Sequence, residues 1–258
     1  MMSQNGDSST EQLLIKALTR RDGWYECPKD ANGKRLGPLV GYAGRDKQGR
    51  QFVGDVYLNA AVLERDPRSL SRLSEKLIIQ LRKSFSNEMV FNTTFCGAPM
   101  GGLALANYLA YCLGRPYVYP EKKVTAIATE HSREQSQLVF QRHEVREGEQ
   151  VLIVEDVCNN FSTTEELVSL IESHGGGVIA IMCLANRSLT VRTAYDHKTS
   201  QTGGHLIPIF SLWDRPILQY GQDDPEVAED VAKGNVVWKP KNEWARLMEA
   251  MNAHRATA

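Results

Sequence analysis

The chain has 258 residues, of which 42% are hydrophobic and 24% charged, a composition typical of a water-soluble globular protein with one large domain, or a core domain and an appendage. A formal net charge of −1 argues against nucleic acid or an anionic membrane surface as a partner. No stretch approaches the roughly 18 apolar residues that span a bilayer. Residues 1–10 lack a signal-peptide pattern, so we expect a cytoplasmic protein.

The cysteines and histidines suggest no metal or disulfide framework. Five widely spaced cysteines contain no CxxC pair: Cys27, Cys96, Cys112, Cys158 and Cys183. This odd number, mostly within apolar segments, favours reduced and buried thiols. The six histidines form no HxxxH or HExxH pattern, so the sequence offers no transition-metal motif.

The N-terminal part predicts a short helix followed by a small, irregular hood that contains β-structure. Residues 1–9 are expected to be disordered, and Thr10 to cap an amphipathic helix that carries apolar residues as far as Leu18. Gly, Pro, Lys and Asp then dominate up to Gly49. Within and just after this stretch, residues 39–42 and 52–58 are expected to be extended.

The next part predicts a helix and then a strand. Asp66-Pro67 is a good helix start, since proline fits the first helical position. Leucines then recur at steps of three and four residues: Leu70, Leu73, Leu77 and Leu81. The apolar run at residues 89–96 predicts a strand that leads into a glycine-rich loop.

The glycine-rich loop, residues 97–102, is followed by an apolar helix that should end at Gly114. A short strand is expected at residues 117–119. Residues 120–137 are polar with little periodicity, and residues 138–142 predict another strand.

A strand, a polar loop and a helix then follow one another. The strand is expected at residues 150–154, the helix at 163–174, and a further strand at 178–185 after three consecutive glycines. This alternation of helices with nearly continuous apolar strands predicts a doubly wound α/β fold, with a mainly parallel central sheet flanked by helices and a small N-terminal hood.

The C-terminal part is less regular. Residues 206–212 are expected to add a strand, and Asp224-Pro225 to start a helix that ends before Gly234, with a last helix at 243–252. Three tryptophans favour packing, although dimerisation or stacking on a base are alternatives: Trp213, Trp238 and Trp244. We divide the chain into a hood (1–66), an α/β core (67–212) and a helical extension packed on the core (213–258).

Two adjacent acids end the strand that begins at residue 150. In open parallel sheets ligands bind beyond the carboxyl ends of the strands, so Glu155 and Asp156 stand where a ligand would be expected. As hydrogen-bond acceptors they match the 2′- and 3′-hydroxyls of a ribose. The helix after residue 161 favours an anion at its N-terminus. The alternative is that Asn159 and Ser162 only cap this helix and the acids are solvated.

Two further segments could complete such a site. In the loop at residues 97–102, glycine allows backbone N–H groups to approach an oxyanion and Pro99 stiffens the turn, although glycines before a helix often serve packing alone. The polar run that starts with Glu121, Lys122 and Lys123 is either a solvated loop or a lid over a charged substrate. Its lid candidates are His131 and Arg133.

Several of these segments resemble a known family. Residues 151–164 resemble the signature of type I phosphoribosyltransferases, an apolar strand with two acids and a polar loop that opens a helix. Residues 97–123 resemble the diphosphate loop, helix and lid entry of orotate phosphoribosyltransferases. Residues 44–67 are loosely similar to the hood of those enzymes, and residues 180–187 are similar to a core strand.

The resemblance implies a homodimeric, Mg²⁺-dependent enzyme of pyrimidine biosynthesis. It would transfer ribose 5-phosphate from 5-phosphoribosyl 1-diphosphate to a base, by positioning and charge stabilisation. Glu155 and Asp156 would hold the ribose, with Lys122 or Lys123 as the lid-entry lysine and magnesium held mainly by the diphosphate. The 5-phosphate residues would be Asn159, Asn160, Phe161, Ser162 and Thr163, and the diphosphate residues Ala98, Pro99, Met100 and Gly101.

The chain departs from the family pattern. The family usually has glycine at the place of Phe161, whose bulk disfavours a positive φ, so we expect a narrowed or reshaped 5-phosphate cradle. Threonines are usual at the places of Asn159 and Asn160. Many orotate enzymes carry lysine at the place of Gly101 and arginine near Glu121, and the loss of these cations should weaken diphosphate binding.

Three hypotheses follow. The first is an orotate-like phosphoribosyltransferase whose acceptor base the sequence does not identify. The second is an inactive homologue that binds a phosphoribosyl compound or nucleotide as a sensor or regulator. The third is a structural α/β domain without a small-molecule site.

Overall fold

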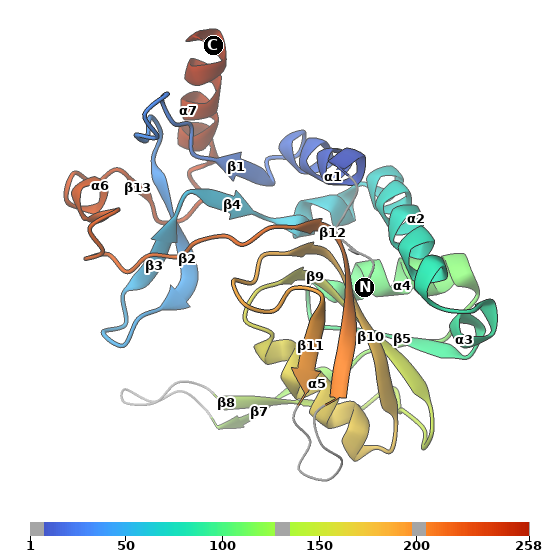
Figure 1. Ribbon diagram of the computed structural model, residues 1–258. Coiled ribbons are helices and arrows are strands. Elements are labelled where there is room, and N and C mark those ends of the chain that lie inside the picture. The colour runs from blue at the N-terminus through green and yellow to red at the C-terminus, as the bar shows by residue number, and fades with distance from the viewer. Residues whose placement is uncertain (1–7, 127–134, 198–204, 258) are drawn as a thin grey trace. The chain divides into compact units, whose positions relative to one another are not determined.

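The computed structural model describes residues 8–126, 135–197 and 205–257 (Figure 1). The chain divides into two compact units, one made of residues 1–14 and 63–215 and the other of residues 15–62 and 216–258. The C-terminal residues therefore form one unit with the hood segment. The sequence-based boundaries after residues 66 and 212 remain predictions.

The first unit contains a sheet of six strands in the order β11-β12-β10-β9-β5-β6 (Figure 1). All neighbouring strands are parallel except β11 and β12, which are antiparallel. Their bounds are Thr93–Gly97 (β5), Tyr117–Val118 (β6), Gln150–Cys158 (β9), Gly177–Asn186 (β10), Ala194–His197 (β11) and His205–Asp214 (β12). The predicted doubly wound α/β fold is confirmed.

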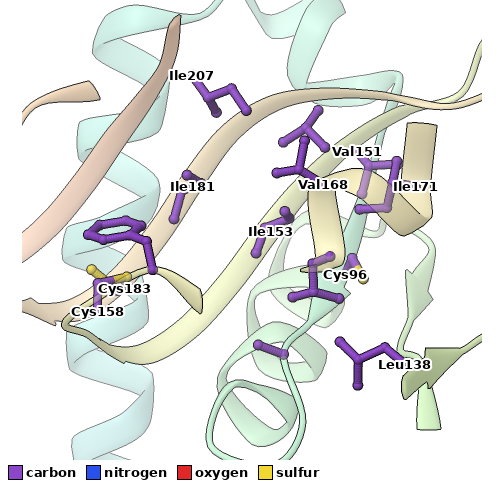
Figure 2. Packing of buried hydrophobic residues seen from close by; sticks show 14 of the residues in the cluster. Cys96, Leu138, Val151, Ile153, Cys158, Val168, Ile171, Ile181, Cys183 and Ile207 are labelled. Atoms are coloured by element: carbon purple, nitrogen blue, oxygen red, sulfur yellow. The ribbon is translucent and has the colours of Figure 1, made fainter. Parts of the chain in front are cut away.

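Helices cover both faces of this sheet (Figure 1). They are α2 (Pro67–Ser84), α3 (Asn87–Phe91), α4 (Gly102–Leu113) and α5 (Ser162–Ser173), while α1 (Ser8–Thr19) begins the described chain. One face of the sheet packs against α5 in a buried apolar cluster, in which Val151 and Ile153 of β9 meet Val168 and Ile171 (Figure 2). The near-continuous apolar sequence of β9 follows from burial on both faces.

The starts and stops of two helices agree with the sequence signals. The Asp66 side chain accepts a hydrogen bond from the backbone N–H of Arg68, and Pro67 occupies the first helical position of α2. Gly114 ends α4 in a left-handed conformation with φ 62°.

Two predicted strands were misplaced. The first half of residues 89–96 is helix α3, because the Ser86 side chain accepts from the N–H of Met89 and caps a helical turn before β5 begins. The strand expected at residues 138–142 is β8 (Gln135–Val139), which pairs antiparallel with β7 (Glu121–Ala126). Cross-strand pairing gives the polar residues of β7 a regular structure that their own pattern does not reveal.

The second unit joins the hood segment to the C-terminal segment. Strand β13 (Val236–Val237) pairs parallel with β2 (Leu39–Arg45), which pairs antiparallel with β3 (Gln51–Gly54). A second ribbon pairs β1 (Trp24–Glu26) with β4 (Val56–Leu58). The remaining helical segments are η1 (Ala60–Arg65), α6 (Ala228–Ala232) and α7 (Trp244–Thr257). The two extended pieces predicted for the hood are thus confirmed.

Helix α6 begins later than the aspartates suggested. The Asp224 carboxylate accepts from the N–H of Gly221 and closes a turn, and its backbone oxygen accepts from Val227 and Ala228. Asp224 therefore stabilises a turn and does not cap a helix that begins at Pro225.

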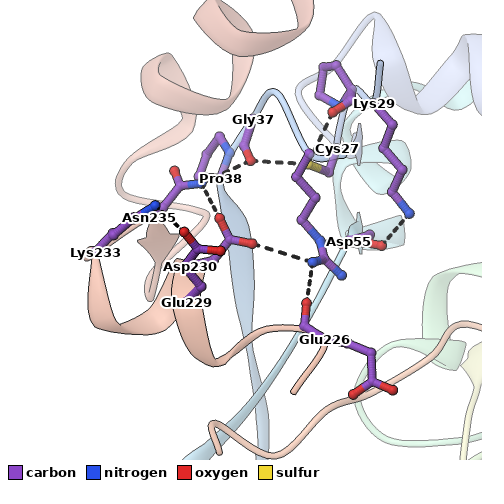
Figure 3. A network of polar contacts seen from close by, with 12 residues as sticks. Cys27, Lys29, Gly37, Pro38, Asp55, Glu226, Glu229, Asp230, Lys233 and Asn235 are labelled. Atoms are coloured by element: carbon purple, nitrogen blue, oxygen red, sulfur yellow. Dashed lines mark hydrogen bonds and ion pairs between the residues drawn. The ribbon is translucent and has the colours of Figure 1, made fainter. Parts of the chain in front are cut away.

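Charged side chains also link the two segments of this unit (Figure 3). Asp55 accepts from Arg35 at 2.5 Å and pairs with Lys29 at 2.7 Å, and Arg35 also reaches Asp230 at 3.4 Å. Hydrogen bonds from Arg35 and Lys29, together with their charges, hold the pKa of Asp55 below its usual range although burial opposes the shift.

The cysteines are free thiols, and four of the five are buried. Cys112 is exposed on α4, contrary to the expectation, because it lies on the face of that helix that carries the exposed Tyr111. Trp213 is buried in β12, Trp238 packs against the small apolar cluster of the second unit, and the Trp244 ring lies 6.0 Å from that of Tyr57. No helix in the described part of the chain is long and apolar enough to cross a membrane.

A close backbone approach fixes the start of α4. A Cβ atom added at Gly102 would lie 2.0 Å from the carbonyl oxygen of Val154 in β9. The same oxygen accepts the N–H of Ala98 at 2.8 Å. The loop at residues 97–102 is therefore held directly against the end of the strand that carries the two acids.

This contact predicts that adding one methyl group at position 102 strongly lowers the stability of the fold. Replacing Gly102 with Ala should lower the free energy of unfolding by about 2–3 kcal/mol, because backbone atoms must move to admit the Cβ. Gly177→Ala is the matched control, since a Cβ there meets nothing within 4 Å, and it should change stability by less than about 0.5 kcal/mol. Urea denaturation of both variants tests this, and equal losses would contradict it.

Candidate functional site

The two acids belong to a longer strand than the sequence suggested. Strand β9 continues to Cys158, so Glu155 and Asp156 are strand residues at its carboxyl end, half-buried, with Glu155 opposite Cys183 of β10. Because the ladder with β10 continues past this pair, the backbone of both acids is fixed by that strand and does not depend on the loop that follows.

Glu155 lies in an environment that disfavours its charge. Its Oε2 is buried and has no hydrogen-bond partner among the described residues. Burial, followed by the negative charge of Asp156, raises the pKa of Glu155 to about 9, although Lys122 opposes the shift. Asp156 accepts from the N–H of Val157 at 2.8 Å. At neutral pH Glu155 therefore holds a proton while a buried acceptor oxygen remains available.

The lid-entry lysines lie on β7 and differ in their surroundings. Lys122 acts electrostatically on Glu155, which places its charge on the side of the acids. Side chains alternate along a strand, so Lys123 points to the opposite face of β7. Lys122 is thus the lysine whose charge acts on the acids, and the role of either lysine at a lid stays a prediction. His131 and Arg133 lie outside the described residues.

The loop between β5 and α4 meets the acids at one glycine. A Cβ at Gly101 would lie 2.4 Å from the Asp156 carboxylate, so a lysine at this position would have to displace that group. Met100 is 78% exposed, whereas Ala98 is buried and donates its N–H to Val154. Ala98 therefore cannot offer that N–H to a diphosphate, and the available donors lie later in the loop.

A small hollow of about 60 Å³ opens where β9 runs into α5. Its lining comes from the end of β9, the loop and the first turn of α5: Glu155, Val157, Cys158, Asn159, Asn160, Phe161, Ser162, Thr163 and Thr164. Asn160 Oδ1 accepts from the backbone N–H and the hydroxyl of Ser162, at 3.2 and 3.0 Å. Asn160 thus closes a turn just before α5 begins, and the N–H groups of Thr163 and Thr164 remain as first-turn donors.

Phe161 adopts the conformation that we expected it to avoid. Its φ of 58° and ψ of 17° are left-handed, a region that costs a non-glycine residue roughly 1–2 kcal/mol. Its side chain is only 4% exposed and belongs to the same apolar cluster as Cys158 and Cys183. These two cysteines are labelled in Figure 2. Burying a phenylalanine contributes roughly 1.5–3 kcal/mol, which offsets the strain. Phe161 therefore has the positive φ that its bulk disfavours, and the narrowing or reshaping of the 5-phosphate cradle stays a prediction.

A cluster of polar side chains behind this loop was not predicted from the sequence. His197 of β11 contacts Glu165 at 3.1 Å and Glu172 at 3.2 Å, and Tyr195 also donates to Glu165. Two signals were present in the sequence. Glutamates seven residues apart, such as Glu165 and Glu172, lie on one face of a helix. Tyr195 and His197 are two residues apart and therefore lie on one face of a strand. The strand itself was not predicted, because it is only four residues long.

A larger cavity of about 550 Å³ lies in the second unit. It is bounded by Ile15 and Thr19, by strands β1 and β4, by residues 216–218 and by α7. None of the residues predicted for the site from the sequence lines this cavity. The chemistry-bearing residues instead gather at the carboxyl ends of β5 and β9.

Comparison with known proteins points to one family. The sequence model described as phosphoribosyl transferase domain matches residues 66–202, more than half of the chain. An orotate phosphoribosyltransferase of Helicobacter pylori (strain ATCC 700392 / 26695) is 26% identical over 166 residues, covering 63% of this chain and 75% of the relative. Its counterpart in Sulfurimonas denitrificans (strain ATCC 33889 / DSM 1251) is 26% identical over 187 residues, covering 71% and 84%.

Solved structures share the fold at low sequence identity. The adenine phosphoribosyl transferase of Trypanosoma brucei has a TM-score of 0.51 at 14% identity, covering 80% of each chain. The UMP synthase of Leishmania donovani has a TM-score of 0.52 at 15% identity, covering 96% of this chain and 43% of that one. These likenesses concern the fold.

The raised pKa of Glu155 predicts a pH-dependent stability. Between about pH 4.5 and about pH 9 the folded protein holds a proton that the unfolded chain releases, so the free energy of unfolding should decline as the pH rises across this window. Glu155→Gln removes the titrating group and should flatten the decline. Urea denaturation at about pH 5 and about pH 9 measures it, with the exposed Glu144→Gln as control. Parallel pH profiles for wild type and Glu155→Gln would contradict the prediction.

Proposed function

Because the chain belongs to the phosphoribosyl transferase domain family, we propose that it transfers ribose 5-phosphate between 5-phosphoribosyl 1-diphosphate and a nitrogenous base. The observation that carries the proposal is the meeting of three parts at the end of β9. Glu155 and Asp156 lie beside the loop that ends at Gly101, and the N-terminus of α5 opens three residues after β9 ends. A base related to orotate is supported by the relatives named orotate phosphoribosyltransferase.

Each part has a matching role in this reaction. The carboxyl groups of Glu155 and Asp156 accept hydrogen bonds from the ribose hydroxyls, and the first-turn N–H groups of α5 bind the 5-phosphate. The bond between C1′ and the diphosphate oxygen breaks, and the diphosphate departs with the electron pair. A base nitrogen supplies the pair for the new C1′–N bond, and the proton that this nitrogen carries is lost to water. Positive charge that develops on the ribose is stabilised by the Asp156 carboxylate, because Glu155 is protonated at neutral pH.

Magnesium fits this arrangement as an ion held mainly by the substrate. Mg²⁺ prefers oxygen ligands and usually binds through one or two carboxylates together with substrate phosphates. Within the described ranges no group of three or more His, Cys, Asp or Glu side chains could hold a metal ion, so the diphosphate would supply most of the ligands. Asp156 is the candidate carboxylate, since Glu155 is protonated at neutral pH, and the ion would offset the negative charge of the departing diphosphate.

A homodimer in the cytoplasm that serves pyrimidine biosynthesis completes the proposal. Support for self-association comes from exposed aromatic side chains on α4 and α3. Tyr111 is 82% exposed, its ring lies 6.5 Å from that of Tyr108, and Phe91 of α3 is 60% exposed. Exposed aromatic side chains are typical of protein interfaces.

A second candidate is a homologue that binds the same ligand without catalysis. The observation that favours it is Gly101, where many orotate enzymes carry lysine. Asp156 occupies the space beside the Gly101 backbone, so a carboxylate stands where the family has a cation near the departing diphosphate.

Ligand binding tests both candidates at once. Calorimetric titration with 5-phosphoribosyl 1-diphosphate and magnesium should show binding to the wild type and none to the double variant Glu155→Ala, Asp156→Ala. Glu144→Ala, Glu147→Ala is the matched control, since it removes two exposed acids elsewhere and should bind like wild type. Retained affinity in the site variant would refute the ribose assignment.

A screen of bases for diphosphate release then separates enzyme from sensor. We expect turnover with orotate or a related pyrimidine. Binding of 5-phosphoribosyl 1-diphosphate without product from any purine or pyrimidine base would favour the sensor, and absence of binding would contradict both.

A further inference from the structure

Two aromatic rings from distant parts of the chain stack behind the 5-phosphate loop. Phe161, the residue that precedes α5, lies with its ring centroid 5.4 Å from that of Tyr195 in β11, at an interplanar angle of 12°. The Phe161 side chain is buried, and Tyr195 packs against the same apolar cluster. The stack therefore joins the loop to an edge strand of the sheet.

The same strand contacts the helix that the loop opens. The Tyr195 hydroxyl donates to Glu165 in the first turn of α5. His197, which is 3% exposed, contacts Glu165 and, two turns along the helix, Glu172. Strand β11 thus contacts α5 from its first turn to its last through side chains of alternating strand residues.

These contacts also engage the Glu165 carboxylate, whose negative charge would repel a phosphate. An acid in the first turn of a helix repels an anion bound at its N-terminus. Although burial opposes it, hydrogen bonds from Tyr195 and His197 lower the pKa of Glu165, so this carboxylate is ionised but engaged on the β11 side. The backbone N–H groups in the first turn of α5 are therefore available to an anion in the hollow.

The left-handed conformation of residue 161 is the feature that the stacked rings stabilise. A left-handed residue at the N-cap turns the chain so that the next N–H groups enter the first helical turn, and glycine reaches this conformation without strain. Phenylalanine reaches it here with its ring held between the core and Tyr195. An alanine would have the same backbone penalty and no ring to offset it.

We infer that Phe161 and Tyr195 are positioning residues for the 5-phosphate, whose stacked rings hold the loop in the left-handed conformation that glycine would otherwise provide. The inference rests on the proposed function, because it takes the hollow at the start of α5 as the phosphate site. The alternative is that the stack only stabilises the core, in which case phosphate affinity would not follow the backbone preference of residue 161.

Variants at position 161 separate these two roles, with ribose 5-phosphate as the calorimetric probe. Phe161→Ala should lose affinity about tenfold, a factor that corresponds to ~1.4 kcal/mol. Phe161→Gly removes even more buried surface but should bind within about twofold of wild type, because glycine adopts the left-handed conformation freely. If the role were core packing alone, Phe161→Gly would be at least as impaired as Phe161→Ala.

Variants at position 195 test the partner ring. Tyr195→Ala should weaken binding about tenfold in the wild-type background and have little effect when residue 161 is glycine, so Phe161→Gly rescues it. Tyr195→Phe is the matched control, since it keeps the ring and leaves Glu165 bonded to His197, and it should bind like wild type. Equal losses from Tyr195→Ala in both backgrounds would overturn the inference.

The outcome also distinguishes this inference from the proposed function. A wild type that binds neither ribose 5-phosphate nor inorganic phosphate contradicts the proposed function, whatever the variants do. The ring pair is then judged by a double-mutant cycle in urea denaturation with Phe161→Ala and Tyr195→Ala. Strictly additive effects would show that the rings do not act together, and this result refutes the inference on its own.

Discussion

The contact between the start of α4 and the carbonyl of Val154 is the constraint on which the candidate site depends. It leaves no room for a side chain at Gly102, and it consumes the N–H of Ala98. Because Val154 immediately precedes the two acids, the same contact fixes the distance between the loop expected to hold the diphosphate and the groups expected to hold the ribose. The loop at residues 97–102 and the end of β9 thus meet through backbone atoms. A change of side-chain rotamer therefore cannot separate them.

The acids themselves illustrate how a site is formed at a cost in stability. Glu155 is held by the β9 ladder in surroundings where its charge is disfavoured by burial and by Asp156, and an acceptor oxygen remains unpaired. A buried polar atom without a partner is unfavourable in the free protein. The proposed ribose hydroxyl would supply the missing donor to this oxygen.

The loop between β9 and α5 shows that one backbone conformation can be reached in two ways. Glycine reaches the left-handed region by lacking a Cβ, whereas Phe161 does so with a ring packed into the core. The second route makes the loop depend on distant residues, since Tyr195 stacks on that ring and strand β11 pairs with β12. Substituting a glycine at a phosphate loop therefore does not by itself remove the loop conformation.

The sequence by itself determined the fold class and the place of the acids. Periodic leucines and the Asp66-Pro67 signal gave α2, Gly114 gave the end of α4, and apolar strands alternating with helices gave the parallel sheet. These features follow from local preferences and from burial, which a residue expresses wherever its neighbours lie.

Only the tertiary structure decided the features that depend on distant partners. The strand β7 exists through its pairing with β8, and the raised pKa of Glu155 through burial beside Asp156. Ser86, not the apolar run after it, decided where β5 begins, because a capped helical turn precedes the strand. The favourable placement of Phe161 required a core to receive its ring, and a sequence shows the strain of a left-handed phenylalanine but not the packing that offsets it.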